Sequence, residues 1–583
     1  MSELAAEVRR HDEAIQRLGL TIWIGAEPTF TRRDSTDACW LHVAEGGDKN
    51  EAARTLLFAL APRLARAPAL WNVIGRQYPG EETPRFCFGV LFGRNDAPGA
   101  PNERPSPGSS AARLSSEPSE PPPVGEGSAW LTVTPDPGVV EVNMAPAHDL
   151  ATFLAWSSHV YDAAADAGLS PLRYRYNGQI TDSGGGGQIT LGGPTPETSP
   201  FLLHPHLLPG VLRYFNRHPS LSYWFATECV GSASQGPRPD EGVRERYEEL
   251  AVALDHVAYL TTPPPKTVAP ADLWGMLAPL LVDCSGNGHR AEVNVEKLWN
   301  ENLPNRGCLG LVELRSLRME RTPERMTAIA ALLRAIMARL VVAPYLEPLV
   351  DHGVQLHGRF ALPWFLEEDL RSILADLHAH EVGLGPLLEA MLLEPRAPIA
   401  KVELGAATLT ISPALEFWPL VGDVASQENA GARIVDASTE RVQVLVTVPE
   451  GESLGDLSVA GWALPLSELP ASDGVVRHIA AVRYRTFEPK PGLHPGLAKT
   501  SPVAFDWRRL GDAVSIELHA WIPGGGIYEG LPHDADEAQR RRDARVLVTS
   551  SPAPTPVRRA LDTSHDIVCL DLRRLPPLET SHV

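Results

Sequence analysis

The sequence has 583 residues, 43% of them hydrophobic and 21% charged, proportions typical of a soluble globular protein with roughly two to four domains. Its formal net charge of −20 argues against a nucleic-acid partner, which needs a basic footprint, and against an anionic membrane surface. No apolar run approaches the length of a membrane span, and the six cysteines form no CxxC pair. We therefore expect a cytoplasmic protein with reduced thiols, no membrane or nucleic-acid partner and no structural zinc site.

The N-terminal part alternates helices and strands. A charged amphipathic helix opens the chain, and a strand follows in which residues 21, 23, 25 and 27 share one face. This strand ends at Pro28 and delivers the carboxylate of Glu27 to its polar face. A helix is expected over 49–66 and a buried strand over 85–92.

Residues 95–128 differ in composition from the rest of the chain. This stretch is rich in Pro, Ser, Gly and Glu and offers too little apolar surface to offset the entropy of ordering. It predicts a disordered insert between a first part of the main domain (1–94) and the remainder of that domain (129–395). From residue 396 to 583 strands with clean alternation dominate, which predicts a C-terminal antiparallel β-rich module.

Two features stand out between residues 129 and 191. A pair of short strands joined by an Asp-Pro-Gly turn places Glu141 and Asn143 on one face. After a helix over 149–167, four glycines at 184–187 precede a strand over 188–191. Glycine runs let backbone N–H groups approach a phosphate closely, but a flexible turn is an equally good interpretation, and the run is not a P-loop.

The stretch 284–319 contains two further strand-like runs whose side chains alternate with period two. Arg290, Glu292, Asn294 and Glu296 share one face of the first run, and Glu313 and Arg315 share one face of the second. Carboxylates, amides and guanidinium groups together suit a divalent cation and phosphate. A half-exposed hairpin whose charges simply pair with each other is the simpler interpretation. Elsewhere, helices dominate 205–260 and are expected over 323–342 and 363–381.

Many ordered motifs together resemble one family. They are IGAEPTF, TPDPGVVEVN, SGGGGQITLGGPTPETSPFL, RYFNRHPSLSYWF, SASQGPRPDE, GNGHRAEVNVEKL, LGLVELRSLRM, QLHGRFALPWF, LHPG and PGGGIYEG. In this order they resemble the amidoligase domain (uncharacterised family 2126) of bacterial transglutaminase-like proteins, across nearly the whole chain except the insert. The resemblance implies an α+β fold in which helices flank an antiparallel sheet like that of glutamine synthetase.

The resemblance also implies an activity and a set of site residues. It implies an ATP- and Mg²⁺-dependent carboxylate–amine ligase that forms an amide through an acyl-phosphate, on a small-molecule, peptide or amino-acid-like substrate. Transglutaminase-like or ATP-grasp-type proteins are expected as partners. The metal would be held by Glu27, Glu141, Glu292 and Glu313, phosphate or substrate by Arg315, Arg290 and Arg238, and the nucleotide by Gly184, Gly185, Gly186, Gln188 and Asn294.

The chain departs from the family pattern in the glycine loop. Relatives read Asn-His after the glycines, whereas this chain has Gly187 and Gln188, and an amide cannot replace imidazole as a metal ligand or proton carrier. No catalytic Cys/His context is present, so a cysteine-dependent acyl transfer is not expected. Two alternatives to the ligase therefore stay open: a catalytically degenerate binding or scaffold relative, and a metal-dependent amide hydrolase.

Overall fold

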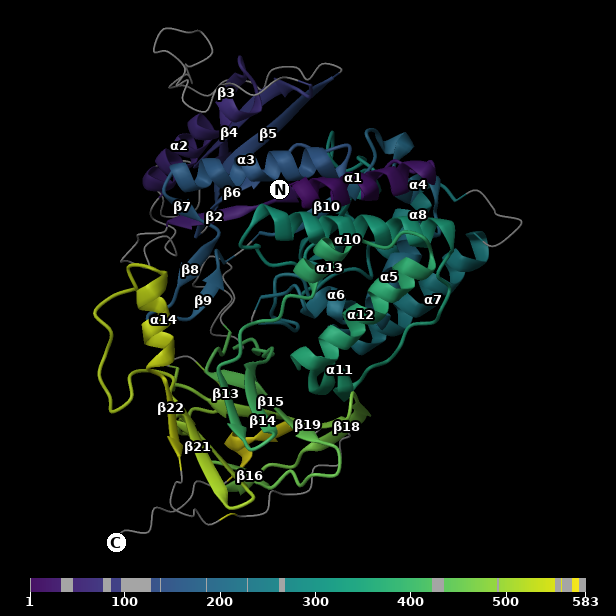
Figure 1. Ribbon diagram of the computed structural model, residues 1–583. Helices are drawn as coiled ribbons and strands as arrows, with labels where there is room; N and C mark the ends of the chain where they lie inside the picture. Colours follow the sequence, from purple (N-terminus) through teal and green to yellow (C-terminus); the bar gives the residue numbers. More distant parts are fainter. Residues whose placement is uncertain are drawn as a thin grey trace.

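The computed structural model describes residues 2–32, 46–76, 85–95, 127–136, 138–184, 186–227, 229–261, 268–421, 435–489, 492–550, 557 and 569–575. It has an α+β fold with antiparallel sheets and flanking helices, as predicted (Figure 1). The Pro/Ser-rich stretch 95–128 lies outside the described residues, apart from its ends at 95 and 127–128. Within the part of the chain that the structure describes, no helix has both the length and the apolar character needed to cross a bilayer.

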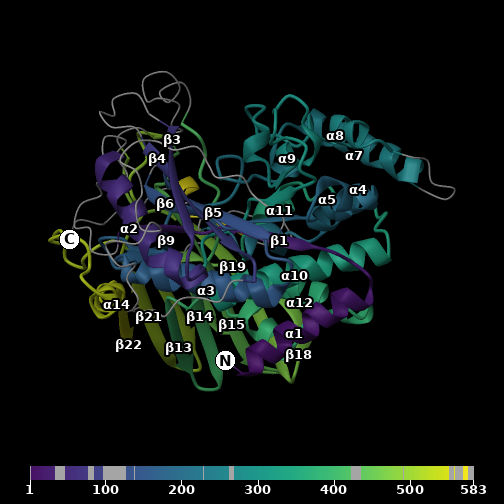
Figure 2. The same cartoon turned by 90° about the horizontal axis from the view of Figure 1, so that it is seen from above.

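A six-stranded sheet forms the N-terminal part, and helices α2 (Gly46–Leu64) and α3 (Leu150–Asp166) pack beside it (Figures 1 and 2). Its strand order is β3-β4-β5-β6-β2-β7. The strands are β2 (Thr29–Arg32), β3 (Ala69–Arg76), β4 (Arg85–Gly93), β5 (Ser128–Asp136), β6 (Val139–Asn143) and β7 (Leu169–Ser170). A small hairpin of β8 (Leu172–Tyr174) and β9 (Ile180–Asp182) leads from this sheet into the glycine loop.

A four-stranded antiparallel sheet lies at the centre of the molecule, in the order β1-β10-β12-β11. It consists of β1 (Trp23–Glu27), β10 (Gln188–Gly192), β12 (Val312–Leu314) and β11 (Val293–Asn294). Its strands come from three distant parts of the chain, so only folding brings their side chains together. The predicted strand over 188–191 is confirmed and extends by one residue.

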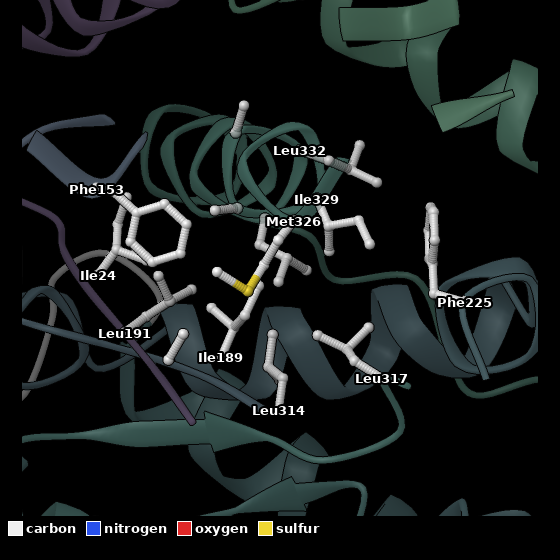
Figure 3. Close-up of a cluster of buried hydrophobic side chains, with 14 of the residues drawn as sticks. Ile24, Phe153, Ile189, Leu191, Phe225, Leu314, Leu317, Met326, Ile329 and Leu332 are labelled. Atoms are coloured by element: carbon white, nitrogen blue, oxygen red, sulfur yellow. The ribbon is translucent and has the colours of Figure 1, made fainter. Parts of the chain in front are cut away.

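One face of the central sheet is apolar and fully buried. Figure 3 shows Ile189 and Leu314 of this face beside Met326 of α10 (Pro323–Val342), and Ile24 of the same face beside Phe153 of α3. Each such burial stabilises the fold by about 2 kcal/mol. Since successive strand side chains point to opposite faces, burying this face fixes which side chains point the other way.

Further helices lie around α10, and α1 among them lies on the same side of α10 as α3 (Figure 1). They are α1 (Ser2–Arg17), α4 (Pro200–Leu203), α5 (Leu207–Arg217), α6 (Ser220–Tyr223), α7 (Arg244–Thr261), α8 (Pro270–Leu277), α9 (Glu296–Trp299), α11 (Val354–Arg359), α12 (Pro363–Ala379) and α13 (Pro386–Leu392). The helix predicted over 323–342 coincides with α10, which Thr322 caps by accepting a hydrogen bond from Arg325 N.

The C-terminal part contains two further sheets whose buried side chains form one hydrophobic cluster. The first has β13 (Ala400–Leu404), β14 (Ala407–Pro413), β15 (Thr439–Pro449), β18 (Ser467–Ser472), β19 (Val475–Arg485) and, parallel to β19, β23 (Cys569–Asp571). The second has β16 (Asp456–Val459), β17 (Trp462–Ala463), β20 (Val503–Arg509), β21 (Asp512–Leu518) and β22 (Val546–Ser550), and helix α14 (Ala535–Asp543) precedes β22. The boundary placed at residue 396 stays a prediction.

The strand predicted over 290–296 is wrong in extent. Only Val293–Asn294 forms a strand, because local side chains end it on both sides. Asn287 caps a 3₁₀ turn over Gly288–Arg290, and Asn294 Oδ1 accepts a hydrogen bond from Glu296 N at 2.7 Å where α9 begins. Such side-chain bonds compete with the strand ladder.

Candidate functional site

The polar face of the central sheet brings together residues that are far apart in the sequence. Glu27 lies directly opposite Gln188, and Glu313 lies between Thr190 on one side and Asn294 on the other. Directly opposed residues of antiparallel strands point to the same face. Carboxylates from β1 and β12 therefore share one surface.

Glu313 is ionised and held by two cations. Its carboxylate forms salt bridges with Arg315 and with Lys297, whose Nζ lies 3.3 Å from Glu313 Oε2. Burial opposes ionisation, but the neighbouring Arg315 and Lys297 outweigh it and hold the pKa of Glu313 below its usual range. Glu313 is thus a fixed negative charge beneath the site.

Gln188 links this pair to Glu27. The hydrogen-bond network orients its amide so that the nitrogen donates to Glu27 Oε2 at 3.2 Å. The amide oxygen then accepts from Gln235 Nε2 at 3.0 Å and from Arg315 Nη2 at 3.2 Å. Gln188 therefore holds a carboxylate and a guanidinium group in one network, as a positioning residue.

Glu141 approaches the same surface from the neighbouring sheet. It lies opposite Thr29 on β2, directly after the end of β1, and accepts a hydrogen bond from Asn143 Nδ2 at 2.9 Å. Burial, together with repulsion by Glu27 and Asp136, raises the pKa of Glu141 to about 8. Burial and Glu313 likewise raise the pKa of Glu27.

The pKa values of Glu27 and Glu141 are raised and that of Glu313 is lowered, and this contrast shows which carboxylates have too little positive charge nearby. Glu313 has its cations, whereas Glu27 and Glu141 carry more negative charge than nearby protein groups neutralise. Such a pair binds either protons or a further cation. Among the described residues, no three His, Cys, Asp or Glu side chains are grouped closely enough to hold a metal by themselves. Mg²⁺ fits this donor set nonetheless, because it commonly binds through one or two carboxylates plus water and substrate phosphates.

The side chain of Arg315 is buried beside Glu313 and Gln188. The side chain is 7% exposed, and no described residue accepts a hydrogen bond from its buried Nε. Buried Nε atoms of other arginines, such as Arg334 and Arg441, also lack an acceptor among the described residues, so this donor indicates a ligand only together with the neighbouring carboxylates. An oxyanion next to Arg315 would satisfy it.

Glu292 does not join the other three carboxylates. Its backbone carbonyl accepts from Arg315 N at 2.9 Å, but the groups that act on its side-chain charge are Arg238, Asp240 and Glu241. Burial raises the pKa of Glu292 to about 7, although Arg238 partly offsets this effect. Its Oε1 is buried and has no hydrogen-bond partner among the described residues. Of the four expected metal ligands, Glu292 thus faces a different set of charged groups from Glu27, Glu141 and Glu313.

Arg238 is the centre of a buried network beside Glu292. Its five N–H groups donate to Asp240 Oδ1 and Oδ2, Phe215 O, Ser222 Oγ and Asn216 O at 2.8–3.0 Å. No donor of Arg238 remains for a ligand in this arrangement. The carbonyl of the preceding Pro237 accepts from Glu292 N at 3.2 Å, so Arg238 anchors the segment that meets Glu292.

Arg290 also lies away from the carboxylate cluster. Its Nη2 donates to Ser234 O at 3.0 Å, and its Nε lies 3.7 Å from Asp283 Oδ2. These contacts tie the 3₁₀ turn to the loop that carries Gln235. Of the three arginines predicted to act in the site, the structure brings only Arg315 to the carboxylates.

The glycine loop is packed tightly against the end of β1. A Cβ on Gly186 would lie 2.3 Å from Thr29 Cγ2, and one on Gly187 would lie 2.1 Å from Arg318 O. Gly187 N donates to Glu27 O at 3.2 Å. Gly184 lies beside the Arg173 guanidinium, and Gly185 lies outside the described residues. Close backbone packing thus accounts for Gly186 and Gly187, and phosphate binding by the loop stays a prediction.

Two residues of the cluster were missed by reasoning from the sequence. Lys297 lies on α9, so strand alternation could not assign it to the polar face. Gln235 lies in a loop, and the glycine that follows it, Gly236, could have indicated that this loop approaches the site. A Cβ on Gly236 would lie 2.8 Å from the carbonyl carbon of Arg315, so the loop needs glycine to approach the site.

Comparison with known proteins identifies the family. No curated protein matches the sequence. A family model described as "Putative amidoligase enzyme (DUF2126)" matches residues 2–104 and 112–573, nearly the whole chain. The resemblance inferred from the motifs is thereby confirmed, and the chain belongs to this amidoligase family.

Proposed function

We propose that the protein is an ATP- and Mg²⁺-dependent carboxylate–amine ligase that forms an amide bond through an acyl-phosphate. The family description supports a ligase-type activity. The observation that supports the ATP-dependent chemistry is the pair of carboxyl groups of Glu27 and Glu141, together with the buried Arg315 Nε, which has no acceptor among the described residues. A phosphate oxygen and a divalent cation would satisfy both features together.

Each group of the cluster has a distinct role in this proposal. Bound ATP would supply a phosphoryl group to the substrate carboxylate with release of ADP, and the amine would then displace phosphate from the acyl-phosphate. Glu27 and Glu141 would hold Mg²⁺. Arg315 binds the oxyanion that develops during transfer, because a guanidinium fixed by Glu313 and Gln188 needs no reorganisation. Asn294 lies opposite Glu313 and supports the same face.

The substrate is an amino-acid-like molecule or a peptide in this proposal. Glu292 and Arg238 act indirectly, since the Glu292 carbonyl accepts from Arg315 N and the carbonyl of Pro237, which precedes Arg238, accepts from Glu292 N. A role for transglutaminase-like or ATP-grasp-type partners, and a fold of the glutamine synthetase type, stay predictions from the resemblance.

A binding relative without catalysis is the second candidate, and one observation favours it. The Lys297 ammonium already lies between Glu27 and Glu313, so part of the carboxylate charge is neutralised from within the chain. Gly187 and Gln188 also replace the Asn-His pair of relatives. Such a protein would keep the fold without turning over ATP.

Titration calorimetry with a non-hydrolysable ATP analogue, with and without Mg²⁺, separates the two candidates. We expect Mg²⁺-dependent binding to the wild type and at least about tenfold weaker binding to Glu313→Gln, since this variant releases Arg315 from its partner. Glu403→Gln, on the exposed side of β13, is the matched control and should bind as the wild type does. Absence of Mg²⁺-dependent nucleotide binding in the wild type would rule out the ligase.

A further inference from the structure

A histidine–glutamate pair lies at the edge of the carboxylate cluster. His289 Nδ1 lies 3.2 Å from Oε2 of Glu296, the first residue of α9, and Glu296 directly precedes Lys297. The charge of His289 acts on the Glu313 carboxylate, so the ring lies near it. The pair therefore adds an imidazole to a site in which the amide of Gln188 cannot carry a proton.

Both members of the pair are held in place through their backbones. Asn287 Oδ1 accepts a hydrogen bond from His289 N at 3.0 Å. Asn294 Oδ1 accepts one from Glu296 N at 2.7 Å, and Asn294 lies directly opposite Glu313 in the central sheet. The two side chains thus meet at a fixed place beside the site.

The pairing leaves one ring nitrogen of His289 available. An ionised carboxylate only accepts hydrogen bonds, so Nδ1 carries the proton that it donates to Glu296, and the lone pair of the neutral ring is on Nε2. Among the described residues, none forms a hydrogen bond with Nε2. The His289 side chain is 58% exposed, so a proton taken up by Nε2 can pass on to water. This is the arrangement of a general base that a carboxylate orients.

The negative charge of the site makes such a base necessary for an amine substrate. Lys297 is itself an alkylammonium at this surface: burial lowers its pKa, but Glu313 and Glu27 outweigh burial and raise it. A substrate amine in the same surroundings would also stay protonated, and an ammonium has no lone pair with which to attack a carbonyl carbon. Glu313 is already paired with two cations, and Glu27 holds Mg²⁺ in the proposed function. His289 lies beside the cluster and can accept the proton.

We propose that His289 is the general base of the reaction and that the amine donor is a primary alkylamine, which is a cation at neutral pH. This role rests on the proposed ligase function. His289 Nε2 removes one proton from the substrate ammonium, and the amine nitrogen then attacks the carbonyl carbon of the acyl-phosphate. The C–N bond forms and the C–O bond to phosphate breaks. The second amine proton leaves with the phosphate as hydrogen phosphate, and His289 releases its proton to solvent.

Two nucleophiles of similar size test the role of His289. Methylamine is protonated at neutral pH and needs a base, whereas hydroxylamine is largely uncharged and does not. Each protein receives ATP, Mg²⁺ and one nucleophile, with a panel of amino acids and dipeptides as carboxylate donors, and mass spectrometry measures the N-methylamide or hydroxamate. His289→Gln should form the methylamide about 100-fold more slowly than the wild type and the hydroxamate at nearly the wild-type rate.

Further variants separate a base from a structural contact. Imidazole added to His289→Ala should restore methylamide formation, because a small base can enter the exposed position. Glu296→Gln should lose part of the methylamide rate and keep the hydroxamate rate, since the ring loses the charge that orients it. His378→Gln on α12 is the matched control: the His378 ring is 55% exposed and pairs with Glu389 on α13, so both rates should equal those of the wild type.

The outcomes distinguish failure of the base from failure of the ligase. Equal loss of both products in folded His289→Gln and His289→Ala, or no loss of either product, would overturn the proposal. A wild type that uses hydroxylamine but not methylamine would also overturn it, because no base would then serve the site. A wild type that forms neither product contradicts the ligase function itself, and the role of His289 falls with it.

Discussion

The ammonium group of Lys297 lies 3.3 Å from Glu313 Oε2. The same Nζ lies 3.7 Å from Glu27 Oε1, so one cation bridges the first and third strands of the central sheet. The Lys297 side chain is 39% exposed, whereas the Glu313 side chain is 4% exposed. Lys297 is therefore the member of the cluster that can withdraw toward solvent when another cation binds.

Lys297→Met should make the protein more responsive to Mg²⁺. Removing the ammonium leaves Glu27 and Glu313 less neutralised, so without metal the variant should unfold about 1 kcal/mol more easily than the wild type. Added MgCl₂ should raise its melting temperature more than that of the wild type. Thermal unfolding with and without Mg²⁺ measures both effects. Lys297→Arg keeps the charge and Lys401→Met removes an exposed lysine elsewhere, so neither should show them. An equal Mg²⁺ response in Lys297→Met and wild type would contradict a cation site here.

Glu141 should make stability fall as pH rises. Its pKa in the folded protein is about 8, against 4.5 for an unperturbed glutamate. Between these values the folded state binds more protons than the unfolded state, so the free energy of unfolding decreases with pH by up to about 1.4 kcal/mol per unit. Glu141→Gln keeps the acceptor for Asn143 but removes the titration.

Urea unfolding at pH 5.5 and pH 7.5 tests this expectation. The difference in unfolding free energy between Glu141→Gln and wild type should shift in favour of the variant at the higher pH. Glu292, whose pKa is also raised, titrates in both proteins and cancels in the comparison. If the difference in unfolding free energy between the variant and the wild type is the same at both pH values, titration of Glu141 does not cause the pH dependence of stability.

Gly187→Ala should be much more destabilising than Gly19→Ala. Both glycines have positive φ, +82° and +69°, so each substitution costs about 1–2 kcal/mol for the left-handed backbone. Only Gly187 also lacks room, because its Cβ would lie 2.1 Å from Arg318 O, whereas nothing lies within 4 Å of a Cβ at Gly19. We expect the free energy of unfolding, measured in urea, to fall by at least about 2 kcal/mol more in Gly187→Ala. Equal losses would mean that the loop relaxes freely.

Patterns in the sequence predicted those helices and strands whose formation depends mainly on residues close to one another in the chain. Helical periodicity predicted the helix at Pro323–Val342, and the strand predicted over 188–191 lies within β10. The same alternation assigned Glu27 and Glu313 to polar strand faces, and the register of the central sheet turns both to one side. The alternation of polar and apolar side chains predicted for these strands is retained in the folded sheet, because the apolar face must be buried.

The sequence by itself determined the family, the α+β class and the polar face of the central sheet, since these depend on motif order and on short-range periodicity. Only the tertiary structure decided which charges meet. Both Glu292 and Glu313 were expected to bind one metal, but the Glu292 carboxyl group faces the Arg238 network, whereas Glu313 pairs with Lys297 and Arg315. The tertiary structure also placed Lys297 of α9 between Glu27 and Glu313. Strand alternation could not predict this position, because Lys297 lies on a helix. Ion pairs form between groups far apart in sequence, and packing, not spacing, sets their distances.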